Sequence, residues 1–216
     1  MTVTAVVFDL GGVLIDWDPR YLYRRLLPGD EVEPFLDEIG FAAWNHLHDS
    51  GGSWAQGVAD LAARHPQHRE LIEAYPQRFL ETLGGSFPET VELLRELSGA
   101  GVRLLALTNW SAETFRIARK EFAFLDLFDD IVVSGEEGVA KPDPRIFRVL
   151  LERNHLAAEQ TVFIDDSQAN VAAAASLGLV GVHYEDPARL RRRLVELQVL
   201  PAGRPPASGP TGDAPA

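Results

Sequence analysis

Five short runs rich in Val, Leu and Ile constrain the fold of this chain more than any other feature. They are TAVVF at 4–8, VRLLAL at 102–107, DIVVS at 130–134, TVFI at 161–164 and LVGVHY at 179–184. Continuous apolar runs of this length are typical of strands buried on both faces. Helical patterns separate the later runs, so we predict an α/β fold built on a doubly wound parallel sheet.

Residues 9–101 break this alternation, because they contain helical signals but no convincing strand. A right-handed crossover needs only one helix, so the surplus predicts an inserted helical subdomain. We therefore divide the chain into a sheet-bearing core at 1–16 and 86–200 and an insertion at 17–85. The last stretch, 201–216, is rich in Pro, Gly and Ala, and we expect a disordered tail there.

Charge and cysteine content exclude several classes of function. The net charge of −12 argues against a nucleic-acid or anionic-membrane partner, because those surfaces are bound through clustered Lys and Arg. The chain has no cysteine, which removes disulfides, thiolate metal sites and cysteine nucleophiles. It shows no secretory pattern and no apolar run of membrane-spanning length, so a cytoplasmic protein is the default expectation.

Polar side chains follow four of the predicted strands, where ligands bind in an open parallel sheet. We expect one constellation there, made of Asp9, Thr108, Asn109, Lys141, Asp165 and Asp166. Clustered carboxylates repel one another unless a cation joins them. Because the set offers hard oxygen ligands and no thiol or histidine, it favours Mg²⁺.

Four segments of the chain resemble, in order, the signature motifs of the haloacid dehalogenase superfamily. They are VVFDLGGVLID, LLALTNWS, AKPDPRIF and TVFIDDSQANVAAAASLG. The resemblance covers about residues 3–185 and implies a Rossmann-like core. A helical insertion between the first two motifs is what that family calls a type 1 cap, as in its subfamily IA, so we refer to residues 17–85 as the cap.

The resemblance assigns the reaction to the strand ends. It implies that Asp9 is a nucleophile that forms an aspartyl ester, with Lys141 shielding the charge of an incoming phosphoryl group. Thr108 would hydrogen-bond a phosphoryl oxygen, as would backbone N–H groups of Gly11, Gly12 or Asn109.

The resemblance also implies the metal ligands. Asp9, Gly11 and Asp165 would lie at a Mg²⁺ site, and Asp166 would bind the ion through water or orient the lysine. The ligand implied beside the metal is a small phosphorylated metabolite. The sequence leaves a monomer and a homodimer equally open.

Gly11 departs from the family pattern. Most phosphatases of this type have a second aspartate two residues after the nucleophile, which protonates the leaving alkoxide and activates water. Three hypotheses follow. The preferred one is a phosphatase for esters that leave easily, such as sugar 1-phosphates, acyl phosphates or aryl phosphates. The others are a 2-haloacid dehalogenase, disfavoured by the Asp165–Asp166 pair, and a catalytically quiet binding protein. Asp16 or Asp18 could replace the missing acid.

The segment FAAWNHLHDSGGSW resembles the cap loop that descends on the active site in related enzymes. Trp44 and His48 are our candidate substrate-binding residues in it, because aromatic and imidazole rings can stack on or hydrogen-bond a sugar. The alternative is that Trp44 and Trp54 fill the small core of the cap. His48 and Asp49 are the polar residues that we expect to face the pocket.

Overall fold

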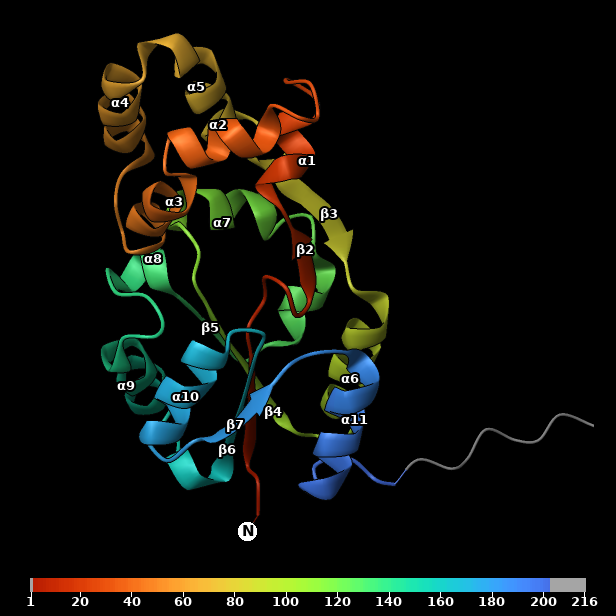
Figure 1. The fold of residues 1–216 in the computed structure, drawn as a ribbon. Helices are drawn as coiled ribbons and strands as arrows, with labels where there is room; N and C mark the ends of the chain where they lie inside the picture. Colours follow the sequence, from red (N-terminus) through yellow and green to blue (C-terminus); the bar gives the residue numbers. More distant parts are fainter. Residues whose placement is uncertain (1, 203–216) are drawn as a thin grey trace, which may run out of the picture.

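A five-stranded parallel sheet forms the centre of the protein, in a computed structural model that describes residues 2–202. Its strand order is β5-β4-β1-β6-β7, so the chain crosses to both sides of β1 (Figure 1). The strands are β1 (Ala5–Phe8), β4 (Arg103–Thr108), β5 (Asp130–Val133), β6 (Thr161–Asp165) and β7 (Val180–His183). Each overlaps one of the five apolar runs, which confirms the predicted doubly wound sheet. Most of the predicted tail, 203–216, lies outside the described residues.

Helices follow the strands of the core in alternation. They are α6 (Pro88–Gly99), α7 (Ala112–Ala118), α8 (Ser134–Glu137), α9 (Pro144–Arg153), α10 (Gln168–Ser176) and α11 (Pro187–Glu196). Short 3₁₀ turns complete the connections at η3 (Ala123–Leu127) and η4 (Ala158–Gln160). Polar side chains cap the N-termini of some of these helices. At the start of α9, Asp143 accepts a hydrogen bond from the backbone N–H of Arg145 at 2.9 Å.

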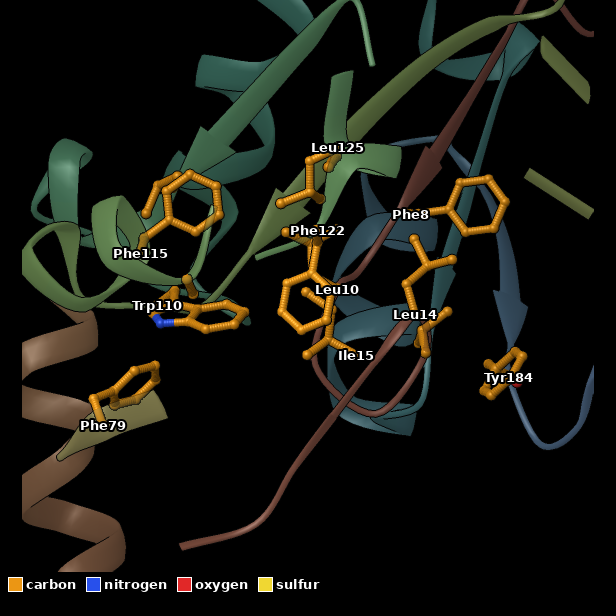
Figure 2. Close-up of a cluster of buried hydrophobic side chains, with 14 of the residues drawn as sticks. Phe8, Leu10, Leu14, Ile15, Phe79, Trp110, Phe115, Phe122, Leu125 and Tyr184 are labelled. Carbon is orange, nitrogen blue, oxygen red and sulfur yellow. The ribbon is translucent and has the colours of Figure 1, made fainter. Parts of the chain in front are cut away.

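The two faces of the sheet pack against different helices. Successive side chains of a strand point to opposite faces. Val6 and Phe8 therefore join a buried cluster with Leu94 of α6, part of which Figure 2 shows around Phe8. Val7 joins a second cluster with Phe147 of α9. Because β1 is covered on both faces, its run of apolar residues is uninterrupted until Asp9.

Five helices of the insertion lie together beyond the carboxyl ends of the strands (Figure 1). They are α1 (Pro19–Tyr23), α2 (Val32–Glu38), α3 (Phe41–Asp49), α4 (Trp54–Arg64) and α5 (Arg69–Gln77), with 3₁₀ turns at η1 (Pro66–His68) and η2 (Phe79–Thr82). Their side chains pack around Tyr23 and Tyr75, whose rings stack at 6.3 Å between centroids. The exact division into core and cap stays a prediction. Within the described residues, every helix is too short or too polar to span a membrane.

A small antiparallel pair of strands connects the core to the cap, so the expectation of no strand within residues 9–101 is wrong. Strands β2 (Ile15–Trp17) and β3 (Leu83–Ser86) pair with Ile15 opposite Ser86. Neither segment has the length or the alternation that marks a strand, and β3 contains two adjacent glycines. The pairing arises from tertiary structure, which brings together segments almost seventy residues apart.

Candidate active site

Asp9 is the first residue after β1 and lies at the carboxyl edge of the sheet. Its backbone N–H donates to the carbonyl oxygen of Ile164 at 2.8 Å, so the residue is held as a continuation of the pairing with β6. The side chain is almost buried, and its Oδ1 accepts a hydrogen bond from the N–H of Leu10 at 2.7 Å. Its Oδ2 lies 2.9 Å from the Nζ atom of Lys141. The carboxylate is thus fixed in one orientation.

Lys141 provides a buried positive charge at this edge. Its ammonium group donates to the carbonyl oxygen of Leu107 at 2.8 Å and to Oδ2 of Asp165 at 2.7 Å, besides its contact with Asp9. An ammonium has three protons, so these three acceptors satisfy it fully. The side chain of Asn109 holds the lysine backbone: it accepts from its N–H at 2.8 Å and donates to its carbonyl at 2.9 Å.

Asp165 is the last residue of β6 and Asp166 follows it, and the two differ in exposure. Asp165 is fully buried, and its Oδ1 accepts from the N–H of Ser167 at 2.8 Å and from the amide of Asn170 at 3.0 Å. It therefore both supports the start of α10 and binds the lysine. Asp166 is exposed and packs on Gly12, where a Cβ atom would lie 2.4 Å from its Oδ2. Gly12 also has φ of +73°, so only glycine fits easily there.

The three carboxyl groups of Asp9, Asp165 and Asp166 form one cluster, in which each offers an oxygen atom within 4.8 Å of the others. Burial and the charge of Asp165 raise the pKa of Asp9, against the opposing charge of Lys141. Partial burial and the same neighbouring carboxylate raise the pKa of Asp166. The oxygen donors and their spacing fit a hard divalent cation, which would relieve this repulsion.

Two other predicted residues lie beside the cluster. Thr108 ends β4 next to β1 and is 1% exposed. Asn109 follows it and lines the adjacent cleft, but its side-chain atoms are engaged by the backbone of Lys141. The structure therefore brings the strand-end residues together, as expected for the carboxyl edge of a parallel sheet.

Between core and cap lies a cleft of about 60 Å³, which we call the inner cleft. Its walls come from both parts of the chain and comprise Gly11, Trp17, Asn45, Asp49, Tyr75, Phe79, Asn109, Trp110 and Thr114. The rings of Phe79 and Trp110 lie 5.8 Å apart and tilted (Figure 2). The indole N–H of Trp110 is buried and has no partner within the described residues, so a ligand atom could satisfy it.

A wider outer hollow of about 390 Å³ adjoins the inner cleft on the cap side. The two spaces share three lining residues, which are Trp17, Asn45 and Asp49. The outer hollow also has charged walls, including Arg20 and Glu33, whose side chains form an ion pair. A ligand that fills both spaces would pass these three shared residues.

Trp44 and His48 lie away from both spaces, contrary to our expectation for substrate-binding residues. Trp44 is 3% exposed and its indole N–H donates to the carbonyl of Gly57 at 3.1 Å. His48 is 1% exposed and stacks on Trp54 with 3.7 Å between ring centroids. Both fill the core of the cap, which matches the alternative interpretation of the two tryptophans.

A different face of helix α3 lines the inner cleft. Asn45 and Asp49 are four residues apart and share one face, and the Asn45 amide donates to Oδ2 of Asp49 at 2.8 Å. The phenol of Tyr75 donates to the Asn45 carbonyl oxygen at 3.2 Å. Of the cap residues that line the inner cleft, only Asp49 is predicted from the sequence to face it. Trp44 and His48 lie on the face of the helix that is buried in the cap. Asn45 and Asp49, which each follow one of them in sequence, are therefore better candidates for binding substrate.

The two acids nearest the nucleophile in sequence have structural partners. Asp16 accepts a hydrogen bond from the phenol of Tyr21 at 2.8 Å. Asp18 begins α1 by accepting from the N–H of Arg20 at 2.9 Å. Neither lines the inner cleft or the outer hollow.

A model of haloacid dehalogenase-like hydrolases matches residues 3–178 of the chain. The chain belongs to this family. The hydrolase is similar to a sesquiterpene phosphatase of Aspergillus oryzae, with 30% identity over an alignment of 202 residues that covers 86% of this chain and 91% of that protein. It is also similar to a phosphorylated carbohydrates phosphatase of Thermotoga maritima, with 28% identity over 191 residues and 83% of each chain covered.

Among solved structures, a family enzyme of Bacteroides thetaiotaomicron in complex with magnesium and inorganic phosphate shares the fold of this hydrolase. The TM-score is 0.67 at 24% identity, covering 87% of this chain and 98% of that one. These findings confirm the predicted family, the Rossmann-like fold and the assignment of the chain to the hydrolases.

Proposed function

We propose that this hydrolase is a Mg²⁺-dependent phosphatase of small phosphorylated metabolites, which acts through an aspartyl phosphate on Asp9. One observation carries the proposal. A nearly buried carboxylate is held beside a buried ammonium group and two further carboxylates at the ligand-binding edge of the sheet. Three carboxylates beside one ammonium group leave negative charge uncompensated, which is costly at a buried site unless a further cation binds there.

The oxygen cluster of Asp9, Asp165 and Asp166 would hold the ion, and the backbone of Gly11 is the fourth predicted participant. A bound Mg²⁺ neutralises phosphate charge and helps to orient the phosphoryl group. Two of the relatives are named phosphatases, and the Bacteroides enzyme was solved with magnesium and phosphate. Those names support the metal and the reaction class proposed for this chain.

Several residues of the chain contribute to the first step, the attack of Asp9 on phosphorus. Asp9 is oriented by Leu10 and Lys141, so that its carboxylate is positioned to attack phosphorus. Lys141 reduces the repulsion between two anions without itself moving, because Asp165, Leu107 and Asn109 fix it. Thr108 and the backbone N–H groups of Gly11 and Asn109 would bind the phosphoryl oxygens. Gly12, which the sequence also suggested for this role, does not offer its N–H, because that group donates to the carbonyl oxygen of Ile15 at 3.0 Å.

For the organic part of the substrate we propose a small polar group with an apolar face, with a sugar 1-phosphate as the specific candidate. The inner cleft has aromatic walls at Trp17, Tyr75, Phe79 and Trp110, and such rings stack on the apolar faces of sugars. An anomeric oxygen also leaves with less help from an acid than a primary alkoxide does. This agrees with the glycine at position 11.

Phosphate release tests the proposal. Purified protein is assayed with an aryl phosphate and with sugar 1- and 6-phosphates, in Mg²⁺ and in EDTA, and Asp9→Asn is the inactive control. We expect Mg²⁺-dependent release that Asp9→Asn abolishes. Release that persists in Asp9→Asn would reject the nucleophile.

A 2-haloacid dehalogenase is the alternative that the nucleophile also permits, because halide departs without a proton. The carboxylate cluster weighs against it, since displacement of halide by Asp9 needs no cation. Halide release from 2-chloropropionate that is unaffected by EDTA would establish this alternative. Absence of turnover on every substrate, combined with binding of phosphorylated ligands, would instead indicate a binding protein.

A further inference from the structure

The glycine at position 11 leaves open space in the inner cleft. A Cβ atom added to Gly11 would meet nothing within 4 Å, and the residue lines the cleft directly after the nucleophile. No acid from the core strand therefore reaches the leaving group. A carboxyl group must come from elsewhere if the reaction includes acid and base catalysis.

Asp49 is the only carboxylic acid among the described residues that line the inner cleft. Asp16 and Asp18, the nearer acids in sequence, line neither space and are held by Tyr21 and by the first turn of α1. The cleft of about 60 Å³ corresponds to the volume of about two water molecules in the liquid, so a group that enters it can touch opposite walls. Asp49 on the cap and Gly11 on the core can thus contact the same molecule.

We propose that Asp49 is the general acid and base of this enzyme, donated by the cap in place of the aspartate that is absent at position 11. The inference rests on the proposed phosphatase function and assigns a catalytic residue that the family motif does not contain. A cap residue in this role would also make closure of core and cap a condition of catalysis.

Asp49 lies where the bridging oxygen of a bound phosphate ester, the atom that must be protonated, is expected. Asp9 does not itself line the inner cleft, but Gly11, two residues further along the chain, does, so a phosphoryl group on Asp9 would face this cleft and the organic group of the substrate would extend through it toward the outer hollow. The bridging oxygen lies between these two ends. Asp49 lines both spaces and therefore lies at their junction.

The surroundings of Asp49 fit its use first as a general acid and then as a general base. The Asn45 amide, itself fixed by the phenol of Tyr75, donates to Oδ2 and orients the carboxyl group. Burial raises the pKa of Asp49 to about 7, while the backbone N–H of Ser111 and the charge of Lys141 oppose this shift. A group with a pKa near neutrality can donate and then accept a proton in one cycle.

The reaction has two steps, and the same carboxyl group serves both. An oxygen of Asp9 attacks phosphorus, the bond from phosphorus to the bridging oxygen breaks, and the Asp49 carboxyl transfers its proton to that oxygen, so that an alcohol leaves. The Asp49 carboxylate then takes a proton from water. The water oxygen attacks phosphorus, the bond to Asp9 breaks, and inorganic phosphate forms. Esters of ordinary alcohols thereby also become substrates.

Leaving-group dependence tests the assignment. Release of the first product is measured in a single turnover with 4-nitrophenyl phosphate, whose phenolate leaves without a proton, and with a primary alkyl phosphate. In Asp49→Asn we expect the aryl ester to react within about threefold of wild type. We expect the alkyl ester to slow by about 10²–10⁴-fold, the usual contribution of a general acid.

Two further variants complete the experiment. Asp60→Asn removes an exposed acid of α4 that bonds only to Gln56 in the described structure, and it should leave both rates unchanged. Gly11→Asp in the Asp49→Asn background places a carboxyl group in the open space at Gly11 and should restore much of the alkyl rate. Restoration would show that Asp49→Asn lost a proton donor rather than its fold.

The outcomes separate this inference from the proposed function. Equal slowing of both esters in Asp49→Asn, or slowing of neither, would overturn the role of Asp49 while Asp9-dependent turnover in wild type still supported the phosphatase. Wild-type protein that releases no product from either ester would overturn both.

Discussion

Asp49 combines a chemical role with a consequence for stability that can be measured without any substrate. Its pKa is 3.8 in an unfolded chain and is raised to about 7 by burial in the folded protein. Between these values the unfolded state has lost the proton and the folded state still binds it. The free energy of unfolding therefore falls as pH rises through this window and is constant above it.

We predict that Asp49→Asn, which keeps the hydrogen bond from Asn45, is more stable than wild type at pH 8 and equally stable at pH 4. The gain at pH 8 should be about 1–3 kcal/mol, since one pKa unit corresponds to about 1.4 kcal/mol and the residue is only half-buried. Urea unfolding in metal-free buffer at both pH values measures it, with Asp60→Asn as the control for loss of charge. A difference that is the same at both pH values would contradict the prediction.

The site residues that could be predicted from the sequence are those placed by the sheet. Asp9, Lys141 and Asp165 lie at or beyond the carboxyl ends of strands, and parallel strands end at one edge, so their meeting follows from topology. The cap residues could not be predicted in the same way. Trp44 and Asn45 lie on adjacent stripes of α3, and periodicity does not say which stripe faces the cap core and which the cleft.

At the scale of elements, helix α8 packs closely against residues 110–112, and Trp110 of this segment lines the inner cleft. The N–H of Gly135 donates to the carbonyl of Trp110 at 3.0 Å. A Cβ atom at Gly135 would lie 2.5 Å from the backbone nitrogen of Ala112 and 2.7 Å from the carbonyl oxygen of Trp110. Backbone atoms cannot move aside as the end of a side chain can.

Gly135→Ala should therefore lower the free energy of unfolding by about 1–3 kcal/mol, the usual effect of overpacking, and displace the Trp110 wall of the cleft. Urea unfolding reports the change in stability, and the change in total tryptophan fluorescence on addition of inorganic phosphate reports the displaced wall. The matched control is Gly99→Ala in α6, where a Cβ atom meets nothing within 4 Å and stability should stay the same or rise slightly. Unchanged stability in Gly135→Ala would show that α8 can shift freely.

Local sequence is sufficient to predict some strands of this protein and insufficient for others. The five strands of the sheet were predictable because each is apolar on both faces and so lacks alternation. Strands β2 and β3 were not, since β2 is only three residues long, β3 contains two glycines, and the two pair only because the cap returns to the core.

At the scale of the whole molecule, core and cap share the candidate site. The core supplies the nucleophile and the carboxylate cluster, while the cap supplies Asp49 and most aromatic walls. Trp54 at the start of α4 ties them together: its indole N–H donates to the Ser111 hydroxyl at 2.8 Å and its backbone N–H donates to Glu113 at 3.1 Å. These bonds hold the cap above the edge of the sheet, so the distance from Asp49 to the nucleophile depends on the packing of the whole chain.

The cluster at that edge should make the stability of the whole molecule depend on Mg²⁺. An ion that binds only the folded state stabilises it by about 2.7 kcal/mol at a hundred times its Kd. We predict that Mg²⁺ raises the Tm of wild type and that Asp166→Asn loses most of this increase. Asp166 is the exposed member of the cluster and is repelled by Asp165, so without the ion the variant should melt at the same temperature as wild type or higher. Asp60→Asn should keep the full increase. Equal Mg²⁺-induced shifts in Asp166→Asn and wild type would place the ion elsewhere and leave the charge of the carboxylate cluster balanced by Lys141 alone.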